Sequence, residues 1–326
     1  DEVGLPAGVF NLVSGTGPVV GERLAEHPDV DMVSFTGSTA AGKRVAKVAA
    51  DTVKRVALEL GGKSANIILD DADLGSAASL AAFTACTHAG QGCAITTRLL
   101  VPRARYDEAV EATAATMGAL PAGDPNDPGT ICGPVISARQ RDRIEEYLRL
   151  AVAEGGSFAV GGGRPADKDR GFFIEPTLVT GLDNSARVAR EEIFGPVLSV
   201  LTFRTPDEAV QKANNTPYGL SAGIWSEKSS RVLWMAEQLR AGVVWANTFN
   251  RFDPATPFGG RKDPAFATHA GLPVAPEGAR GVDAVARVGP HPAGPQLPGH
   301  AEHPARPLAP DAGREPAGRG VGLLHR

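Results

Sequence analysis

The sequence predicts an α/β fold in which helices cover a mainly parallel sheet. Two stretches of the chain each alternate apolar, β-prone segments with helix-like segments, and the pair Gly61-Gly62 separates the two stretches. Such alternation is typical of parallel sheets flanked by helices. Hydrophobic residues make up 42% of the 326 residues and charged residues 21%, which is ordinary for a globular protein long enough for two domains.

The first stretch predicts three strands separated by two helices. Val56, Leu58 and Leu60 alternate with other side chains at the period of a half-buried strand. The expected elements are a strand over 9–13, a helix over 19–26, a strand over 31–36, a helix over 40–50 and a strand over 53–60.

The second stretch restarts the alternation beyond Gly61-Gly62. The segment 121–134 is rich in Gly, Pro and Asp and predicts a loop. The expected strands cover 66–69, 97–102, 196–203, 221–225 and 242–247, and the expected helices cover 74–87, 106–118, 138–154, 207–214 and 229–239.

The composition changes abruptly near Asp263. Residues 263–326 hold eleven of the 26 prolines and five of the seven histidines, and they contain no Ile, Asn, Ser, Lys, Tyr or Trp. This composition cannot build a packed core, so we expect a disordered or irregular tail. It is either a disordered functional tail or, as we favour, the out-of-frame translation of a GC-rich reading frame. Its histidines lack regular ligand spacing, and we expect no metal site.

Charge and cysteine content exclude several classes of protein. A net charge of −4 and a pI near 6.0 give no basic footprint for nucleic acid. No apolar run is long enough to span a membrane, and the first residues do not resemble a signal peptide. Three cysteines without metal-ligand spacing fit a reducing compartment, so we expect a cytoplasmic protein.

Cys93 is the first candidate for chemistry. It follows a helix-like stretch in Gly90-Gln91-Gly92-Cys93, where the glycines allow unusual backbone angles and close approach of a ligand. An isolated cysteine is most often a small buried hydrophobe, and we read Cys86 and Cys132 that way. The loop context instead favours an exposed nucleophile at Cys93.

Glu59 is the second candidate. It stands 34 positions before Cys93, at the carboxyl end of a predicted parallel strand, and such strand ends border ligand sites. The plain alternative is a surface carboxylate. A carboxylate in a closed apolar site would have a raised pKa and could act as a base near neutrality.

Two glycine-rich turns could hold a dinucleotide. Gly15-x-Gly17-x-x-x-Gly21 follows a strand and opens a helix, but alone it is a weak signal. Phe35-Thr36-Gly37-Ser38-Thr39-x-x-Gly42 is more specific, because a helix N-terminus offers free N–H groups to a phosphate. The alternative for this second turn is a simple Ser or Thr helix cap.

Three segments together resemble the NAD(P)-dependent aldehyde dehydrogenase family. They are Leu58-Glu59-Leu60-Gly61-Gly62-Lys63-Ser64, Gly90-Gln91-Gly92-Cys93 and Glu191-Glu192-Ile193-Phe194-Gly195-Pro196, and they occur in the order and at the spacing of that family. The resemblance runs from about residue 4 to about residue 262. It implies the C-terminal half of a Rossmann-like coenzyme domain over 1–61 and an α/β catalytic domain over 62–262.

The resemblance also implies roles for residues. Cys93 would be the nucleophile that forms a thiohemiacetal and then a thioester, and Glu59 would activate the water that hydrolyses the thioester. The cofactor would be NAD or NADP, and the substrate a small-molecule aldehyde. Phe258, in Thr256-Pro257-Phe258-Gly259-Gly260, would help to shape the substrate end, or the segment is a plain structural turn. The residues implied in cofactor binding are Gly17, Gly37, Ser38, Thr39, Gly42, Leu60, Glu192 and Phe194.

The chain departs from the family pattern at both ends. Family members carry a segment before residue 1 that holds half of the coenzyme fold, residues that contact the adenine ribose and an Asn of the oxyanion hole, so we expect an N-terminally truncated chain with little or no activity. The strand used in family oligomers is missing beyond Lys262, which makes the usual homo-oligomer doubtful. Two alternatives stay open: a cofactor-independent thiol esterase that pairs Cys93 with His88, and a non-catalytic product.

Overall fold

The computed structural model describes residues 4–252 and 258–261 and the backbone of 265–266. The rest of the expected tail lies outside these residues, as do Thr256 and Pro257. The chain forms two compact units. Among the described residues, the smaller unit holds 4–35 and 43–56, and the larger unit holds 36–42 and everything from 57 onward.

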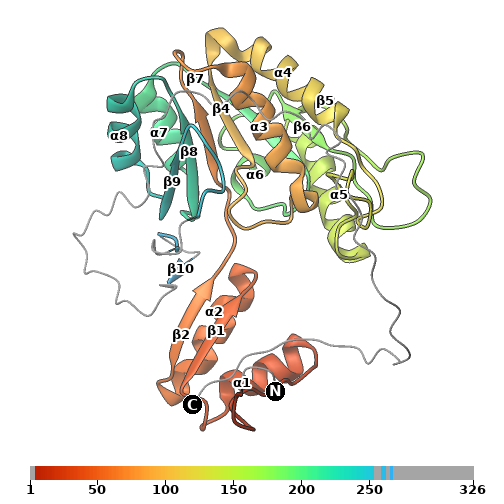
Figure 1. The fold of residues 1–326 in the computed structure, drawn as a ribbon. Helices are drawn as coiled ribbons and strands as arrows, with labels where there is room; N and C mark the ends of the chain where they lie inside the picture. Colours follow the sequence, from red (N-terminus) through yellow and green to blue (C-terminus); the bar gives the residue numbers. More distant parts are fainter. Residues whose placement is uncertain (1–3, 253–257, 262–264, 267–326) are drawn as a thin grey trace. The chain divides into compact units, whose positions relative to one another are not determined.

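The larger unit is built on a seven-stranded sheet with the order β5-β6-β7-β4-β3-β8-β9 (Figure 1). All neighbouring strands are parallel except β5 and β6, which are antiparallel. The central strands β3, β4 and β8 are almost wholly buried, as expected when helices cover both faces of a parallel sheet. The strands are β3 (Ala65–Ile68), β4 (Arg98–Pro102), β5 (Ser157–Val160), β6 (Thr177–Thr180), β7 (Val197–Phe203), β8 (Ser221–Trp225) and β9 (Val243–Ala246).

Helices pack on this sheet, and some of them begin at side-chain N-caps. The Asp73 carboxylate accepts the Ser76 N–H at the start of α3, and the Ser137 hydroxyl accepts the Gln140 N–H at the start of α5. α3 and α4 pack on each other and on strands of the sheet, while α7 contacts β7 and α8 contacts β8. The helices are α3 (Leu74–Cys86), α4 (Tyr106–Ala119), α5 (Ala138–Ala153), α6 (Arg187–Arg190), α7 (Pro206–Asn214) and α8 (Ser229–Gln238), with 3₁₀ turns η3 (Thr87–Gly90) and η4 (Arg103–Arg105).

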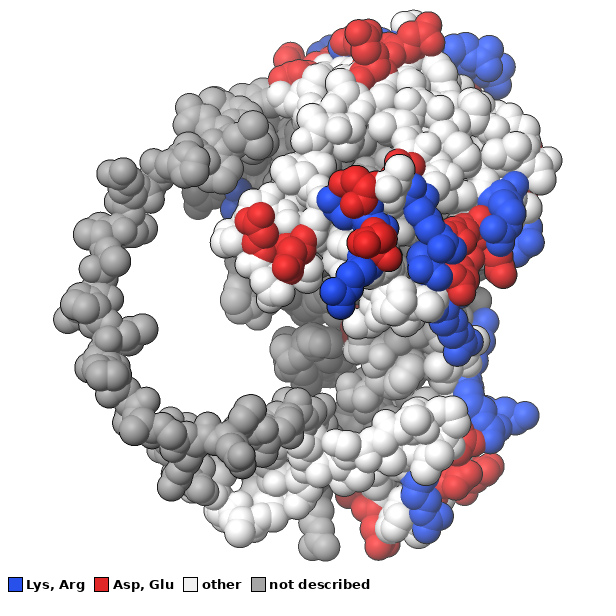
Figure 2. All heavy atoms as spheres, turned by 90° about the vertical axis from the view of Figure 1, so that its right-hand side faces the viewer, with Lys and Arg blue, Asp and Glu red and all other residues white. Residues whose placement is uncertain are grey.

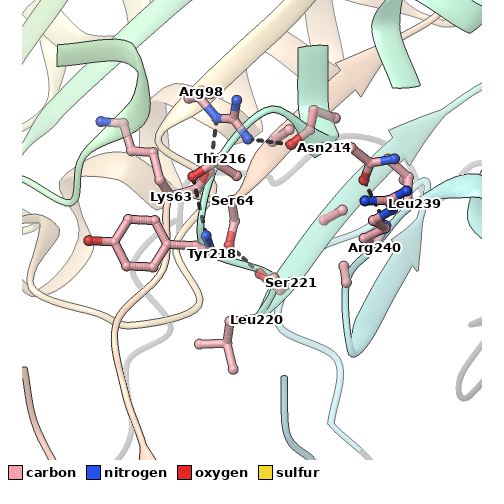
Figure 3. A pocket seen from close by; sticks show the side chains of 15 residues that line it. Lys63, Ser64, Arg98, Asn214, Thr216, Tyr218, Leu220, Ser221, Leu239 and Arg240 are labelled. Carbon is pink, nitrogen blue, oxygen red and sulfur yellow. Dashed lines mark hydrogen bonds between the residues drawn. The ribbon is translucent and has the colours of Figure 1, made fainter. Parts of the chain in front are cut away.

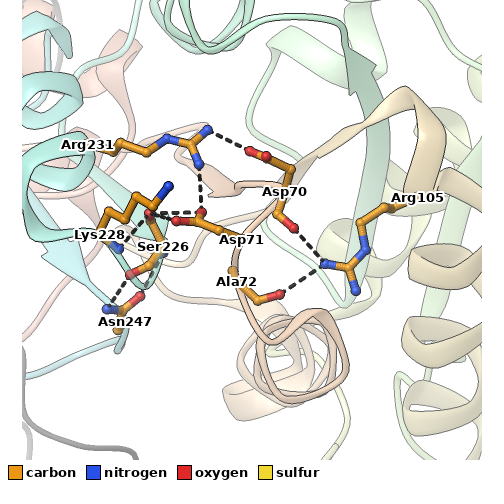
Figure 4. Close-up of polar contacts among 8 residues, drawn as sticks. All are labelled: Asp70, Asp71, Ala72, Arg105, Ser226, Lys228, Arg231 and Asn247. Atoms are coloured by element: carbon orange, nitrogen blue, oxygen red, sulfur yellow. Dashed lines mark hydrogen bonds and ion pairs between the residues drawn. The ribbon is translucent and has the colours of Figure 1, made fainter.

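In the seven-stranded sheet, the carboxyl ends of the strands differ from their amino ends. At the carboxyl ends of β3 and β8, Asp71 accepts hydrogen bonds at 2.9 Å from Ser226 and forms an ion pair with Arg231 at 2.9 Å (Figure 4). The Asn247 side chain bonds the backbone of Ser226 on both sides. At the carboxyl ends, polar side chains therefore bond to one another. The loops that carry the candidate catalytic residues lie at the opposite, amino ends of the strands.

The smaller unit and the segments joining it carry a short three-stranded sheet with the order β1-β2-β10. The Arg55 N–H donates to Asp31 at one end, and the Gly37 N–H donates to Glu59 at the other. β10 pairs with β2 in the antiparallel sense, with Ala265 opposite Glu59. The elements are a π-helix η1 (Gly17–Gly21), α1 (Glu22–Glu26), β1 (Met32–Thr36), α2 (Thr39–Ala49), η2 (Ala50–Thr52), β2 (Arg55–Glu59) and β10 (Ala265–Phe266).

The structure confirms the α/β fold class with a parallel-rich sheet, but two details of the sequence prediction are wrong. Residues 9–13 form no strand; a turn bonds the Val9 N–H to Pro6, and the segment pairs with no strand in the described ranges. Strands β5 and β6 were not predicted, because each has four residues and lies beside glycines or a proline.

Charged side chains of both signs lie close together on the face shown in Figure 2. Among the described residues, charged side chains pair directly in places, such as Arg141 with Asp142 at 3.0 Å. In the described part of the chain, no helix has the length and apolar character needed to cross a membrane. The same residues contain no group of three His, Cys, Asp or Glu side chains arranged to hold a metal ion.

Candidate active site

Cys93 lies in a turn that leads into β4, at the amino edge of the seven-stranded sheet. Cys93 is half-buried. Gly62, just before β3, approaches it so closely that an added Cβ atom would lie 2.6 Å from the Cys93 carbonyl oxygen. The glycine before β3 is therefore required by the position of the cysteine loop.

Neighbouring side chains hold the cysteine loop in place. The Ser221 hydroxyl bonds the Ala94 carbonyl oxygen at 2.8 Å and the Ser64 hydroxyl at 2.8 Å (Figure 3). On the other side, the Gln91 side-chain oxygen accepts the Ile136 N–H at 3.0 Å. These contacts hold the chain on both sides of Cys93.

The charge of Glu59 influences the pKa of the Cys93 thiol. Burial raises the pKa of Cys93, and the negative charges of Glu59 and then Glu192 raise that pKa further, while the N–H groups of Ala94 and Cys93 lower it. Glu59 is the last residue of β2 and is 8% exposed. A buried carboxylate at a strand end thus acts on the thiol through space, and its role as a base stays a prediction.

An apolar and aromatic cluster borders Cys93. Its buried members are Ala94, Leu220, Val243 and Trp245, and Cys93, Phe249 and Phe258 pack against it. The Trp245 ring meets Phe249 edge to face, with centroids 4.9 Å apart. Phe258 and Cys93 therefore pack against the same cluster, and the choice between a substrate-shaping residue and a plain structural turn stays open.

Glu192 reaches the same region from the loop after α6. Its Oε1 accepts the Gly62 N–H at 3.1 Å, and its carboxylate packs on Gly61 where a Cβ would otherwise be. Burial raises the pKa of Glu192; the Gly62 N–H, Arg143 and Lys63 each act to lower it. The glycine pair that separates the two stretches of the sequence thus also contacts this carboxylate.

Helix α5 shapes the Phe194 turn. The Gln140 side-chain amide donates to the carbonyl oxygens of Ile193 at 3.0 Å and Phe194 at 2.8 Å. Phe194 has a φ of 61°, an uncommon value for a residue with a side chain, and its ring is 36% exposed. Arg143 adds a bond to the Glu192 carbonyl oxygen at 2.8 Å. α5 therefore presents both Glu192 and Phe194, a role that the sequence did not reveal.

The turn before α2 contains the other predicted cofactor residues. The Ser38 hydroxyl accepts the Ala41 N–H at 3.3 Å and so caps the helix, as the plain alternative expected. The Thr39 hydroxyl oxygen beside it is buried and has no hydrogen-bond partner among the described residues. Gly42 packs against the Leu60 side chain, where a Cβ would collide. Gly17, at the start of η1, belongs to the smaller unit.

The remaining cysteines and His88 lie outside this arrangement. Cys86 and Cys132 are buried in the main core, as predicted, and burial raises the pKa of both thiols, that of Cys132 to about 11. His88 is exposed, at a φ of 53°, and it is not among the groups that shift the Cys93 pKa. The described chain thus gives no support to a Cys93–His88 pair.

Comparison with known proteins agrees with this geometry. Residues 1–275 match the aldehyde dehydrogenase family. The chain is 47% identical to a 3-succinoylsemialdehyde-pyridine dehydrogenase of a Pseudomonas species over 263 residues, which cover 80% of this chain and 55% of that protein. It is 43% identical to a geranial dehydrogenase of Castellaniella defragrans, over 83% of this chain and 56% of the relative.

Solved structures give the same result. A betaine aldehyde dehydrogenase of Staphylococcus aureus in complex with NAD+ matches with a TM-score of 0.80 and 42% identity, over 82% of this chain and 53% of that one. An aldehyde dehydrogenase C variant of Pseudomonas syringae with NAD+ and octanal matches with a TM-score of 0.80 and 43% identity, over 82% and 55%. The chain spans about half the length of these proteins, and it belongs to the aldehyde dehydrogenase family.

Proposed function

We propose that this chain carries the thiol half of an NAD(P)-dependent aldehyde oxidation, with Cys93 as nucleophile and Glu59 as general base. The observation that carries the proposal is the electrostatic coupling of Glu59 to the Cys93 thiol in a half-buried, aromatic-lined site. A carboxylate that faces a thiol but does not deprotonate it strongly is suited to a later step, the activation of water.

The proposed chemistry begins with the Cys93 thiolate. Its sulfur attacks the aldehyde carbonyl carbon and forms a C–S bond, and the N–H groups of Cys93 and Ala94, which already face the sulfur, lie near the developing oxyanion. A bound nicotinamide supplies a hydride acceptor, and loss of hydride from the carbon leaves a thioester. Glu59 then takes a proton from water, the water oxygen attacks the thioester carbon, the C–S bond breaks and a carboxylic acid leaves.

The residues present fit a nicotinamide dinucleotide. The buried, unpartnered Thr39 hydroxyl at the start of α2 suits a phosphate oxygen, with Gly37 and Ser38 beside it. Glu192 would hold the ribose hydroxyls and the exposed Phe194 would contact the nicotinamide. Gly42 and Leu60 would form the wall between the phosphate end and the nicotinamide end of the site. We propose Gly17 as a further contact. The choice between NAD and NADP stays open.

The aromatic cluster supports an apolar or aromatic aldehyde as substrate. Trp245, Phe249 and Phe258 border the thiol, whereas His88 is exposed and Cys86 is buried in the main core. The octanal complex of the Pseudomonas syringae relative is consistent with this class. A cytoplasmic location stays a prediction from the cysteine content, and the homo-oligomer that is usual in the family stays doubtful for this chain.

The proposal is tested with stoichiometric amounts of the chain, octanal or benzaldehyde, and NAD or NADP. We expect at most slow turnover, and reduced nicotinamide in an amount comparable to the chain. Cys93→Ala should abolish the signal, and Glu59→Gln should release one equivalent and then stop. Reduction that survives Cys93→Ala, or no reduction even at stoichiometric level, would contradict the proposal for this chain.

Hydrolysis of p-nitrophenyl acetate separates this proposal from a cofactor-independent esterase. If Glu59 deacylates the thioester, Glu59→Gln gives a burst of p-nitrophenol followed by slow release, and His88→Ala leaves the reaction unchanged. Ester hydrolysis that requires His88 would instead favour the esterase.

A further inference from the structure

Glu191 is the member of the Glu191-Glu192 pair to which the proposed reaction gives no role. Side chains from two helices hold its carboxylate. The Tyr147 hydroxyl of α5 donates to Glu191 Oε2 at 2.8 Å. The Arg187 guanidinium of α6 donates to both oxygens of the same carboxylate, at 2.7 Å and 2.9 Å. A carboxylate with three hydrogen bonds from two helices has far less rotational freedom than a free surface glutamate.

The backbone links this anchor to Glu192. Glu191 has a φ of −100° and a ψ of 148°, an extended conformation in which successive side chains point to opposite sides. When the Glu191 side chain is fixed on α5 and α6, the Glu192 side chain must leave on the other side. There its Oε1 accepts the Gly62 N–H at 3.1 Å. The anchor on Glu191 therefore limits the directions that are open to Glu192.

Tyr147 belongs to a row of α5 residues that contact this segment. Gln140, Arg143 and Tyr147 are spaced by three and four positions, so they line one side of the helix. Arg143 donates to the Glu192 carbonyl oxygen at 2.8 Å, and its guanidinium lies over the Tyr147 ring, 5.6 Å from the centroid. The Tyr147 ring is therefore held in place beside Glu191.

Of the two groups that hold Glu191, Tyr147 is the better anchor. The Arg187 side chain is 61% exposed, and exposed ion pairs contribute little to stability. Tyr147 is half-buried. Burial first, and then the bond to Glu191, raises the pKa of Tyr147 to about 12, so its hydroxyl keeps the donated proton near neutrality.

We propose that Tyr147 and Glu191 are positioning residues for Glu192: the hydrogen bond between them holds the chain so that the Glu192 carboxylate stays turned onto Gly62. The consequence for nicotinamide binding rests on the proposed function, whereas the effect on Glu192 itself does not. The role requires no contact between Tyr147 and a cofactor.

Hydrogen exchange of the Gly62 amide tests the proposal without any cofactor, because Glu192 accepts that N–H. The exchange rate is measured by NMR near neutral pH in a chain with isotope-labelled glycine. Tyr147→Phe removes one oxygen and keeps the ring, and it should speed exchange at Gly62 roughly five- to tenfold. Glu191→Ala should speed it at least as much. Glu192→Ala removes the acceptor itself and sets the fastest rate expected.

A second glycine amide in the same sample separates positioning from a general loss of structure. The Gly242 N–H donates to the Gly219 carbonyl oxygen at 3.0 Å, in a part of the sheet that Tyr147 does not contact. Its exchange should be the same in the wild type and Tyr147→Phe. A variant that is merely destabilised would speed exchange at Gly62 and Gly242 alike.

Matched variants control the experiment. The Tyr106 hydroxyl of α4 accepts the Gly181 N–H at 3.3 Å, so Tyr106→Phe also deletes a bonded hydroxyl and should leave exchange at Gly62 unchanged. Glu191→Gln keeps an oxygen that can accept the Tyr147 hydroxyl, and it should exchange more slowly than Glu191→Ala. Tyr147→Phe added to Glu191→Ala should cause no further increase, since both changes remove the same bond.

Protection of Cys93 from iodoacetamide by NAD+ forms a second arm, which depends on the proposed function. Tyr147→Phe should raise the half-protecting concentration several-fold, and by no more than Glu192→Ala does. Cys86 and Cys132 are buried and should stay unlabelled in every variant, which verifies that the core is intact.

Equal exchange at Gly62 in the wild type and Tyr147→Phe overturns the proposal, as does faster exchange at Gly62 and Gly242 together. Protection that Glu192→Ala weakens but Tyr147→Phe leaves unchanged overturns the consequence for nicotinamide binding. If NAD+ does not protect the wild type, the proposed function fails for this chain, but exchange at Gly62 still decides the role of Tyr147.

Discussion

At the residue scale, the surroundings of Cys93 raise the pKa of its thiol and so reduce the amount of nucleophilic thiolate. Burial, Glu59 and Glu192 all raise its pKa, so the thiolate is a minor species near neutrality. We expect Glu59→Gln to lower the Cys93 pKa and to speed alkylation near pH 7.5 several-fold, because a repelling charge is removed. The measurement is the pH dependence of iodoacetamide labelling.

The matched control is Glu111→Gln, which removes an exposed carboxylate from α4. Its labelling curve should coincide with that of the wild type. A Cys93 pKa that stays unchanged in Glu59→Gln would mean that Glu59 is not ionised in the folded chain. In that case, its role as a base would need a different explanation.

Lys63 also leaves a mark on stability. The folded chain releases the Lys63 proton at about pH 7, while the unfolded chain keeps it to about 10.5, so the unfolded state binds more protons between these values and stability rises with pH. The slope is at most about 1.4 kcal/mol per pH unit. Urea unfolding of the wild type and Lys63→Met should therefore give a difference that grows by about 2 kcal/mol from near pH 7 to near pH 8.5.

This comparison cancels the other titrating groups, since both chains share them. A constant difference across that pH range would show that Lys63 keeps its proton in the folded state.

At the element scale, α5 determines the shape of the cofactor side of the site. Gln140 satisfies two carbonyl oxygens of a turn whose Phe194 has a positive φ. Gln140→Ala should cost about 1–3 kcal/mol in unfolding free energy and weaken protection of Cys93 by NAD+. Arg139→Ala, at an exposed position on the first turn of the same helix, should change neither. Equal behaviour of the two variants would contradict a role for α5.

The expectations for Cys93 and Glu59 rest on local signals and on the family resemblance. Glycines beside the cysteine and at the end of an apolar strand mark close backbone approach, and the structure shows that approach between Gly62 and Cys93. The contribution of Gln140 could not be predicted, because it acts on a turn about fifty residues away with nothing in its own surroundings to mark it. Long-range side-chain bonds have no periodic signature.

The same distinction holds for the strands. Strands that continue an apolar run into the sheet, such as β7, were predicted nearly to their ends. The segment 9–13 has the residue types of a strand, but a strand also needs a hydrogen-bonding neighbour, and the described chain offers it none. β-propensity describes the fit to a neighbouring strand more than an intrinsic backbone preference.

At the scale of the whole molecule, the two units differ in how much apolar surface they bury. In the described chain, the buried residues of the larger hydrophobic cluster begin at Ala65 and those of the smaller cluster at Ala94. Neither cluster therefore has a buried member in the smaller unit. Among the described residues of the smaller unit, Ala25, Val48 and Ala49 are the buried apolar ones, whereas Val13, Val19 and Val53 are 54%, 68% and 91% exposed. A unit with so small a core has little to oppose its chain entropy.

Limited proteolysis tests this difference, because cleavage of a briefly open segment follows its local stability. Trypsin should cut the smaller unit first, at Lys43, Arg44, Lys47, Lys54 or Arg55, and leave a resistant fragment that contains β3 to β9. The buried Lys63 and Arg98 should resist cleavage in that fragment, since their backbones lie in or beside the main sheet. Mass spectrometry of the early products identifies the cuts. If the smaller unit survives as long as the larger one, its exposed apolar side chains are covered in solution. A light-scattering or chemical-shift measurement of self-association would then show whether a second copy of the chain covers them.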